Sequence, residues 1–295
     1  MPSLKDIRIR IKSVTSTQQI TSAMKMVSAA KLRRAQDAII KMRPYAGKLR
    51  ELLENLSSGV ESQEIDIYAR KRDPKKVLIV VFTSNKGLCG AFNANIVKRA
   101  QLLIQEEYSE AQRTGNLHLM CIGKKGGEYF RKRNFPNIIL HNELLEAPSF
   151  EKTVPIVEEI IATFRDGGYD AVDLVYNQFK NAAVQRVIAE KMLPISPPET
   201  KEKKSGGFRH DFILEPSKEV IVSGLIPKSL KIQFYKAMLD SLASEHGARM
   251  TAMHKATDNA GEILKDLRLT YNKVRQAQIT REIVEIVSGA NALNG

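Results

Sequence analysis

Two glycine-containing segments have the composition of phosphate-binding loops. The first covers residues 84–90, with the sequence SNKGLCG, and the second covers residues 123–127, with the sequence GKKGG. Each follows an apolar run and precedes a helical pattern, where amides at a helix N-terminus bind phosphate in nucleotide-binding proteins. Neither has the P-loop spacing or the G-x-G-x-x-G fingerprint. An ordinary strand-to-helix turn is therefore favoured, and a nucleotide-binding enzyme using residues 84–90 is kept as an alternative.

The side chains that could hold a metal ion or perform catalysis are scattered. The five histidines show no metal-ligand spacing with a cysteine or with one another: His118, His141, His210, His246 and His254. The two cysteines, Cys89 and Cys121, are isolated, which favours a reducing compartment over a disulfide framework or a zinc site. No triad or carboxylate pair follows from residue order. We therefore expect no catalytic residue, metal or cofactor in this chain.

The middle of the chain alternates between strand and helix patterns. Apolar, β-branched runs predict strands at 77–82, 117–122, 137–140, 170–176 and 184–192. Helices are expected at 91–113, just after residue 127, and at 155–164. This alternation predicts a parallel or mixed sheet covered by helices, in a Rossmann-like α/β domain.

The C-terminal segment has a heptad pattern. A seam with a period of 3.5 residues runs through Leu239, Ala243, His246, Met250, Met253, Thr257, Ala260, Leu264, Leu267, Tyr271, Val274 and Gln278. We expect a helix from about residue 227 to 288, after a break near Gly224 and Pro227. Its length would be roughly 90 Å at 1.5 Å per residue, so it should project from a globular domain.

The N-terminal segment offers a partner helix ending near residue 57. Its frame includes Leu4, Ile7, Ile11, Val14, Leu32, Ala35, Ile39, Met42, Ala46, Leu49, Leu53 and Leu56. Where the frame meets polar residues at 18–28, the apolar stripe is expected to slide to Ile20, Met24 and Val27. An antiparallel coiled coil of the two ends is predicted, with segments 1–58, 76–215 and 217–295 as N-terminal helix, α/β domain and C-terminal helix.

Beyond Gln278 the C-terminal helix has no partner in this frame. Its apolar residues move to Ile279, Ile283, Ile286 and Val287. Exposed apolar residues on a single helix indicate that other subunits surround it.

The charge distribution indicates an acidic partner. The net charge is +13, and residues 1–50 carry twelve lysines and arginines against two aspartates. A basic nucleic-acid-binding coiled coil is an alternative, but the chain has no tryptophan, and from residue 231 it carries nine basic and seven acidic residues. A steep salt dependence of binding would identify the nucleic-acid alternative. No apolar run is long enough to span a membrane.

The two ends resemble the gamma subunits of F-type, proton-translocating ATP synthases. The resemblance lies in residues 7–27 and 84–90, and above all in residues 248–253, 256–261, 271–280 and 285–290. It implies a non-catalytic central shaft inside a ring of alpha and beta subunits, with the foot on the epsilon subunit and the membrane c-ring. It also implies a peripheral position on the cytoplasmic side of the bacterial inner membrane, with no nucleic acid bound.

The resemblance also implies which residues meet the partners. The predicted contacts with the beta and alpha subunits are Met24, Lys25, Lys31, Arg34, Arg249, Arg275, Gln276, Thr280 and Glu285. Those with epsilon and the c-ring are His210, Asp211 and Phe212. Some family members carry an acidic residue where this chain has Lys25.

Overall fold

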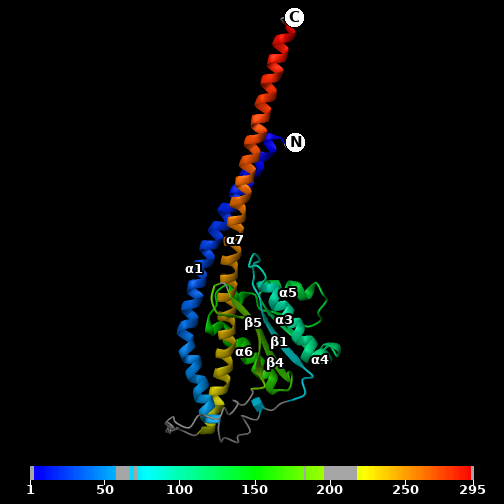
Figure 1. Ribbon diagram of the computed structural model, residues 1–295. Coiled ribbons are helices and arrows are strands. Elements are labelled where there is room, and N and C mark those ends of the chain that lie inside the picture. Colours follow the sequence, from blue (N-terminus) through cyan, green and yellow to red (C-terminus); the bar gives the residue numbers. More distant parts are fainter. Residues whose placement is uncertain (1–2, 58–66, 70–71, 183, 196–217, 294–295) are drawn as a thin grey trace. The chain divides into compact units, whose positions relative to one another are not determined.

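The computed structural model describes residues 3–57, 67–69, 72–182, 184–195 and 218–293 (Figure 1). Two long helices, α1 (Leu4–Ser57) and α7 (Lys218–Leu293), flank an α/β segment in the sequence. The elements between them are β1 (Val77–Phe82), α3 (Phe92–Glu107), α4 (Ser109–Arg113), β2 (Leu117–Ile122), α5 (Lys124–Arg131), β3 (Ile138–Leu140), a 3-10 turn η1 (Glu143–Leu145), α6 (Phe150–Arg165), β4 (Ala171–Phe179) and β5 (Gln185–Leu193).

The five strands form one mixed sheet in the order β3-β2-β1-β4-β5. Strands β1 to β4 are parallel, with Val77 of β1 paired to Leu117 of β2 and to Ala171 of β4. Strand β5 runs antiparallel to β4. The predicted mixed sheet is confirmed, and its strands lie within a few residues of the expected ranges.

The central strand β1 is buried on both faces, as its unbroken apolar run predicts. Leu78, Val80 and Phe82 point into a core made with α6 and with the part of α7 up to Leu242. Val77, Ile79 and Val81 point into the opposite core, made mainly with α3. Alternation along a strand places these residues on opposite faces.

The chain divides into two compact units. One comprises residues 1–29 and 249–295, and the other comprises residues 30–248. The helices pair antiparallel within each unit. In the first unit, Arg8 donates a hydrogen bond to Tyr271 and Thr257 donates one to Thr21. In the second, the Lys228 ammonium lies over the ring of Tyr45, 5.8 Å from its centroid.

The predicted break near Gly224 and Pro227 is wrong, because α7 continues through both residues. Proline removes one backbone donor, which usually interrupts a helix. Here Ile226 and Leu230, on either side of it, are 5% and 2% exposed in the sheet core. Packing of these side chains holds the helix across the missing hydrogen bond.

The helix predicted at 91–113 is divided in two by Tyr108, whose φ of −127° lies outside the helical range. Its side chain is buried, and its hydroxyl donates a 2.5 Å hydrogen bond to Asp173 of β4. A contact 65 residues away in the sequence therefore interrupts this helix, which local pattern does not reveal.

Candidate functional site

The sheet has the reversal of strand order at which doubly wound domains bind nucleotides. The chain leaves β1 toward β2 and later returns to β4 on the other side of β1, so the strand order reverses between β1 and β4. In such sheets, ligands bind beyond the carboxyl ends of these two strands. A small-molecule site in this domain would therefore lie beyond the ends of β1 and β4.

Helix α7 occupies the ends of both strands. The Ser241 hydroxyl donates a 3.3 Å hydrogen bond to the carbonyl oxygen of Phe82, the last residue of β1. The Ser244 hydroxyl donates a 3.0 Å hydrogen bond to the carbonyl oxygen of Asn177 in β4. A Cβ on Gly247 would lie 3.1 Å from the carbonyl oxygen of Ala182, so glycine permits this close approach. The chain's own helix thus lies where a nucleotide would bind.

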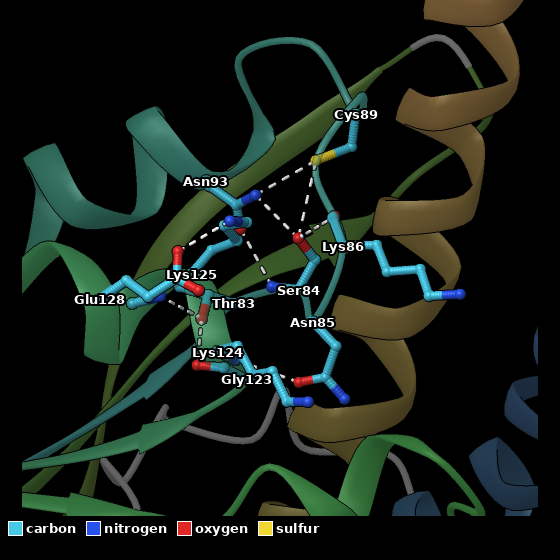
Figure 2. A network of polar contacts seen from close by, with 11 residues as sticks. Thr83, Ser84, Asn85, Lys86, Cys89, Asn93, Gly123, Lys124, Lys125 and Glu128 are labelled. Atoms are coloured by element: carbon cyan, nitrogen blue, oxygen red, sulfur yellow. Dashed lines mark hydrogen bonds and ion pairs between the residues drawn. The ribbon is translucent and has the colours of Figure 1, made fainter.

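The amides at the start of α5 are also engaged, as Figure 2 shows. The Lys124 amide donates to the Asn85 side-chain oxygen at 3.1 Å, and the Lys125 amide donates to the Ser84 carbonyl oxygen at 3.0 Å. The Gly126 amide donates to the Thr83 hydroxyl at 2.9 Å. A phosphate would have to displace all three partners, which disfavours phosphate binding at residues 123–127.

The loop at 84–90 is tied down by its own side chains. Asn93 of α3 donates 2.8 Å and 3.2 Å hydrogen bonds to the Ser84 hydroxyl and to the Cys89 sulfur. The Ser84 hydroxyl donates in turn to the carbonyl oxygen of Lys86 at 2.7 Å. Ser84 is fully buried and Cys89 is 1% exposed. Figure 2 shows Asn93 bonded to the Ser84 hydroxyl and the Cys89 sulfur. These contacts support the interpretation of the loop as a structural turn.

A buried hydrogen-bonded pair links the sheet to a helix junction: Asp173 of β4 and Tyr108 between α3 and α4. Asp173 of β4 is 3% exposed, and burial raises its pKa to about 6, although the hydrogen bond from Tyr108 and the charge of Lys191 oppose the shift. Burial and the carboxylate together raise the pKa of the Tyr108 hydroxyl. The pair links β4 to the α3–α4 junction, which gives it a structural role.

In the described part of the chain, no three His, Cys, Asp or Glu side chains are grouped to hold a metal ion. Nor does this part contain a helix with the length and apolar character needed to cross a membrane.

The predicted coiled-coil seam is present in the unit of residues 1–29 and 249–295. Met253, Ala260 and Leu264 are buried to between 4% and 5% exposure, and Ile7 of α1 is 4% exposed. The half-buried positions of α7 continue through Val274, and every described residue after Val274 is exposed. The seam therefore ends one step before Gln278, the last predicted position.

The predicted slide of the α1 stripe is wrong. Ile20 and Val27 are 60% and 57% exposed, whereas Thr21 and Ser28 are 9% and 3% exposed. The polar residues can be buried because their hydroxyls have partners. Thr257 donates to Thr21 at 2.8 Å, and Ser28 donates to the Met24 carbonyl oxygen at 2.8 Å. The seven-residue frame thus continues without a shift.

The outward apolar residues of α1 form a surface that the sequence analysis missed. Four of them are 57% to 65% exposed: Ile9, Ile20, Met26 and Val27. Their positions in the heptad could have predicted this exposure, since all four fall outside the frame that contains Ile7, Ile11 and Val14. Apolar residues at outward heptad positions indicate a partner.

The predicted partner-contact residues differ in accessibility. Lys31, Arg34, Arg275, Gln276, Thr280 and Glu285 are exposed, and Met24 and Lys25 are half-buried. Arg249 is 8% exposed and already makes an interaction within the chain. Glu285 accepts a 2.8 Å hydrogen bond from Arg281 one turn before it. The predicted residues His210, Asp211 and Phe212 lie outside the described residues.

The end of α7 is apolar and exposed, as predicted. Five large side chains between residues 279 and 287 are 48% to 71% exposed: Ile279, Ile283, Val284, Ile286 and Val287. An apolar surface of this kind marks a site of protein interaction.

Comparisons with known sequences cover nearly the whole chain. A family model described as ATP synthase matches residues 3–293. The ATP synthase gamma chain of Cytophaga hutchinsonii is 54% identical over 294 residues, covering 100% of both chains. That of Flavobacterium johnsoniae is 54% identical over 295 residues, again covering 100% of both.

Chains in solved structures of mitochondrial ATP synthases share the fold. A chain in the central stalk/c-ring structure of the Tetrahymena thermophila mitochondrial ATP synthase is 28% identical, with a TM-score of 0.58, covering 80% of this chain and 99% of that one. A chain in the Euglena gracilis mitochondrial OSCP/F1/c-ring structure, rotational state 3, is 23% identical, with a TM-score of 0.70, covering 98% and 94%. By its full-length identity to the curated gamma chains, the chain belongs to the family of ATP synthase gamma chains.

Proposed function

We propose that the chain is the central rotating stalk subunit of an F-type ATP synthase. In this role it couples proton flow through the membrane c-ring to ATP synthesis and hydrolysis at the beta subunits. The observation that carries the proposal is the end of α7, where five large apolar side chains are 48% to 71% exposed. A stalk end enclosed by a ring of subunits would bury such a surface.

The mechanism rests on asymmetry. A helix pair without threefold symmetry presents a different face to each of three identical beta subunits, so each face stabilises a different conformation. Rotation exchanges the faces and so exchanges the populations. A face can shift a conformational equilibrium only by its difference in binding free energy between the two states.

The proposed partners are the alpha and beta subunits for the coiled coil, and the epsilon subunit and c-ring for the foot. Lys31 and Arg34 on α1 are exposed, and this suits an acidic surface on beta. On α7, Arg275 and Gln276 before the apolar end and Thr280 within it are the proposed polar contacts. Arg249 is assigned a supporting role within the chain, because it is buried. His210, Asp211 and Phe212 remain the proposed foot contacts.

The subunit is proposed to be non-catalytic and peripheral, on the cytoplasmic side of the bacterial inner membrane. Two features of the α/β domain support a non-catalytic role. Helix α7 lies across the strand ends where a nucleotide would bind, and the α5 amides are bound by residues of the neighbouring loop. The chemistry is therefore assigned to the beta subunits.

Replacing Arg275 tests the proposal in the assembled complex. Arg275→Ala should slow ATP hydrolysis or reduce the protons pumped per ATP, because it removes an exposed cation from a face assigned to beta. The free energy of unfolding of the isolated chain should change by less than about 0.5 kcal/mol. Turnover and proton pumping are measured in reconstituted vesicles.

Lys273→Ala is the matched control. It removes the same charge two residues away, about 200° around the helix. If Arg275→Ala leaves turnover and pumping at wild-type values, the assigned contact is wrong. If both variants lose the same activity, net charge rather than this contact is responsible.

A further inference from the structure

In the unit of residues 1–29 and 249–295, three charged or titratable groups meet at one nitrogen atom. Nδ1 of His254 on α7 lies 3.3 Å from the Lys25 ammonium on α1. The same Nδ1 lies 3.3 Å from a carboxylate oxygen of Asp258, one turn further along α7. Nδ1 can accept from Lys25 only when it carries no proton, and it can donate to Asp258 only when it carries one.

We infer that His254 is a positioning residue for Lys25, holding the lysine against α7 when neutral and releasing it when protonated. In the neutral state with the proton on Nε2, the hydrogen bond crosses between the two helices. In the protonated state, Nδ1–H donates to Asp258 within α7, and the imidazolium repels the ammonium. Histidine is the side chain suited to such a change near neutral pH.

Lys25 lies at the seam between α1 and α7, where a movement of its ammonium changes the charge on the surface of the helix pair. It occupies the seam frame one turn after Thr21, whose hydroxyl bonds to Thr257 and fixes the local alignment of the helices. Lys25 is half-buried, whereas Lys31 and Arg34 extend into solvent. Because the side chain is half-buried, the partner of its ammonium decides where the charge lies. Among the described residues, the charged groups at ion-pair distance from His254 are Lys25 from α1 and Asp258 from α7.

This inference rests on the proposed function, in which Lys25 contacts a beta subunit. Release of Lys25 would move a positive charge on that face without any change in the fold. His254 is 55% and Asp258 62% exposed at the side chain, so the free energy involved is that of a surface interaction. The effect on coupling should therefore be modest, about twofold.

The first experiment uses the isolated full-length chain and does not depend on the proposed function. Nitrogen-15 NMR of labelled histidine at pH 8 reports which ring nitrogen carries the proton, and the signal lost in His254→Asn assigns the residue. We expect the wild-type proton on Nε2. Lys25→Met should move it to Nδ1, because Asp258 is then the remaining partner, and Lys31→Met should leave it in place. An unchanged tautomer in Lys25→Met would overturn the inference.

The second experiment uses the assembled complex. The protons pumped per ATP are compared at pH 6 and pH 8 for wild type, His254→Asn, whose side-chain oxygen accepts at both pH values, and His254→Lys, a permanent cation. Both variants should reduce the dependence on pH by about twofold, and each should resemble one limit of the wild type. His141→Asn is the matched control, since His141 pairs with Glu143 in the other unit. A wild-type pH ratio in His254→Asn would refute a role in coupling.

The two results separate the two ideas. A tautomer change in Lys25→Met, with no effect of Arg275→Ala in the complex, would retain the Lys25–His254 interaction and reject the contact that the proposed function assigns to Arg275. An effect of Arg275→Ala without the tautomer change would support the contact assigned to Arg275 and reject the Lys25–His254 interaction.

Discussion

Asp173 is a single carboxyl group whose surroundings oppose its charge. It lies within the sheet, receives a hydrogen bond from Tyr108 and is paired in register with Lys191 of β5. Desolvation outweighs these favourable contacts and raises its pKa from 3.8 to about 6. In the folded state, Asp173 therefore keeps its proton to a higher pH than in the unfolded state.

Asp173→Asn should reveal this in the pH dependence of stability. Between pH 4 and pH 6 the folded wild type binds more protons at this site than the unfolded chain, so the contribution of Asp173 to the free energy of unfolding falls as the pH rises. Asparagine does not titrate. The stability of the variant relative to wild type should therefore rise by about 2 kcal/mol between pH 4 and pH 7.5.

Urea unfolding at several pH values measures this difference. Tyr108→Phe removes a hydrogen bond that favours the charged carboxylate, so the fall in stability with rising pH should continue to a higher pH than in the wild type. A difference between Asp173→Asn and wild type that stays constant over the whole pH range would contradict the prediction.

Gly123 is a backbone position that other residues cannot occupy without strain. Its φ is +110°, and an added Cβ would lie 2.3 Å from the Thr83 carbonyl oxygen. Gly123→Ala should lower the free energy of unfolding by more than 2 kcal/mol, from the steric clash and the backbone strain together. Gly115→Ala is the matched control, since Gly115 has a φ of +75° with open space around it, and it should cost about 1 kcal/mol. Equal costs in urea unfolding would show that the clash is relieved.

Helix α1 shows that the frame of a coiled coil can persist where its residues are polar. The seam position of Thr21 is buried although the apolar Ile20 is its direct neighbour in the sequence. Moving the seam onto Ile20 would require a turn of the helix of about 100°, which would also remove Ile7 from the seam. The packing of apolar seam residues such as Ile7, together with the hydrogen-bonded hydroxyls of Thr21 and Ser28, outweighs the free energy that burying Ile20 would contribute.

Two isoleucines on α1, in the same unit, test this arrangement. Ile7 is 4% exposed in the seam, and Ile20 is 60% exposed on the outer face. Ile7→Ala should cost about 2 kcal/mol, because it removes buried methyl groups. Ile20→Ala should change the free energy of unfolding by less than about 0.5 kcal/mol. Urea unfolding followed by helical circular dichroism compares the two variants. A larger loss of stability in Ile20→Ala than in Ile7→Ala would show that Ile20 belongs to the seam.

The whole molecule combines a net charge of +13 with an apolar end on α7. Charge repulsion opposes self-association, whereas an uncovered apolar surface promotes it. A rotating stalk subunit removed from its ring should therefore associate through this end, most strongly at high salt, where the repulsion is screened.

Replacing two residues at this end should reduce the association. Ile283→Ser with Ile286→Ser removes side chains that are 55% and 71% exposed, so the monomer fraction in sedimentation velocity should rise while the unfolding free energy stays unchanged. Ile263→Ser with Leu269→Ser removes exposed apolar residues from an earlier part of α7 and should leave association at the wild-type level. A wild-type chain that stays monomeric at high salt would argue against the apolar end as an interaction surface.

The regular elements were largely predictable because their patterns are local. The run at 77–82 is apolar at every position, which indicates a strand covered on both faces, and the heptads from Leu239 to Val274 are regular enough to predict one seam. The exposed end of α7 also followed from the change of frame after Gln278. Period and residue type are properties of the chain, so no tertiary contact was needed to read them.

Other features depended on contacts between distant residues. Tyr108 interrupts a helix because Asp173 lies opposite it, and α7 passes through Pro227 because Ile226 and Leu230 pack into the sheet. Thr21 belongs to the seam because Thr257 supplies its hydrogen bond. Helix α7 lies against β1 and β4 because Ser241 and Ser244 donate hydrogen bonds to carbonyl oxygens of these strands. Each outcome requires the free energy of a particular long-range contact, and residue order carries no record of which contact forms.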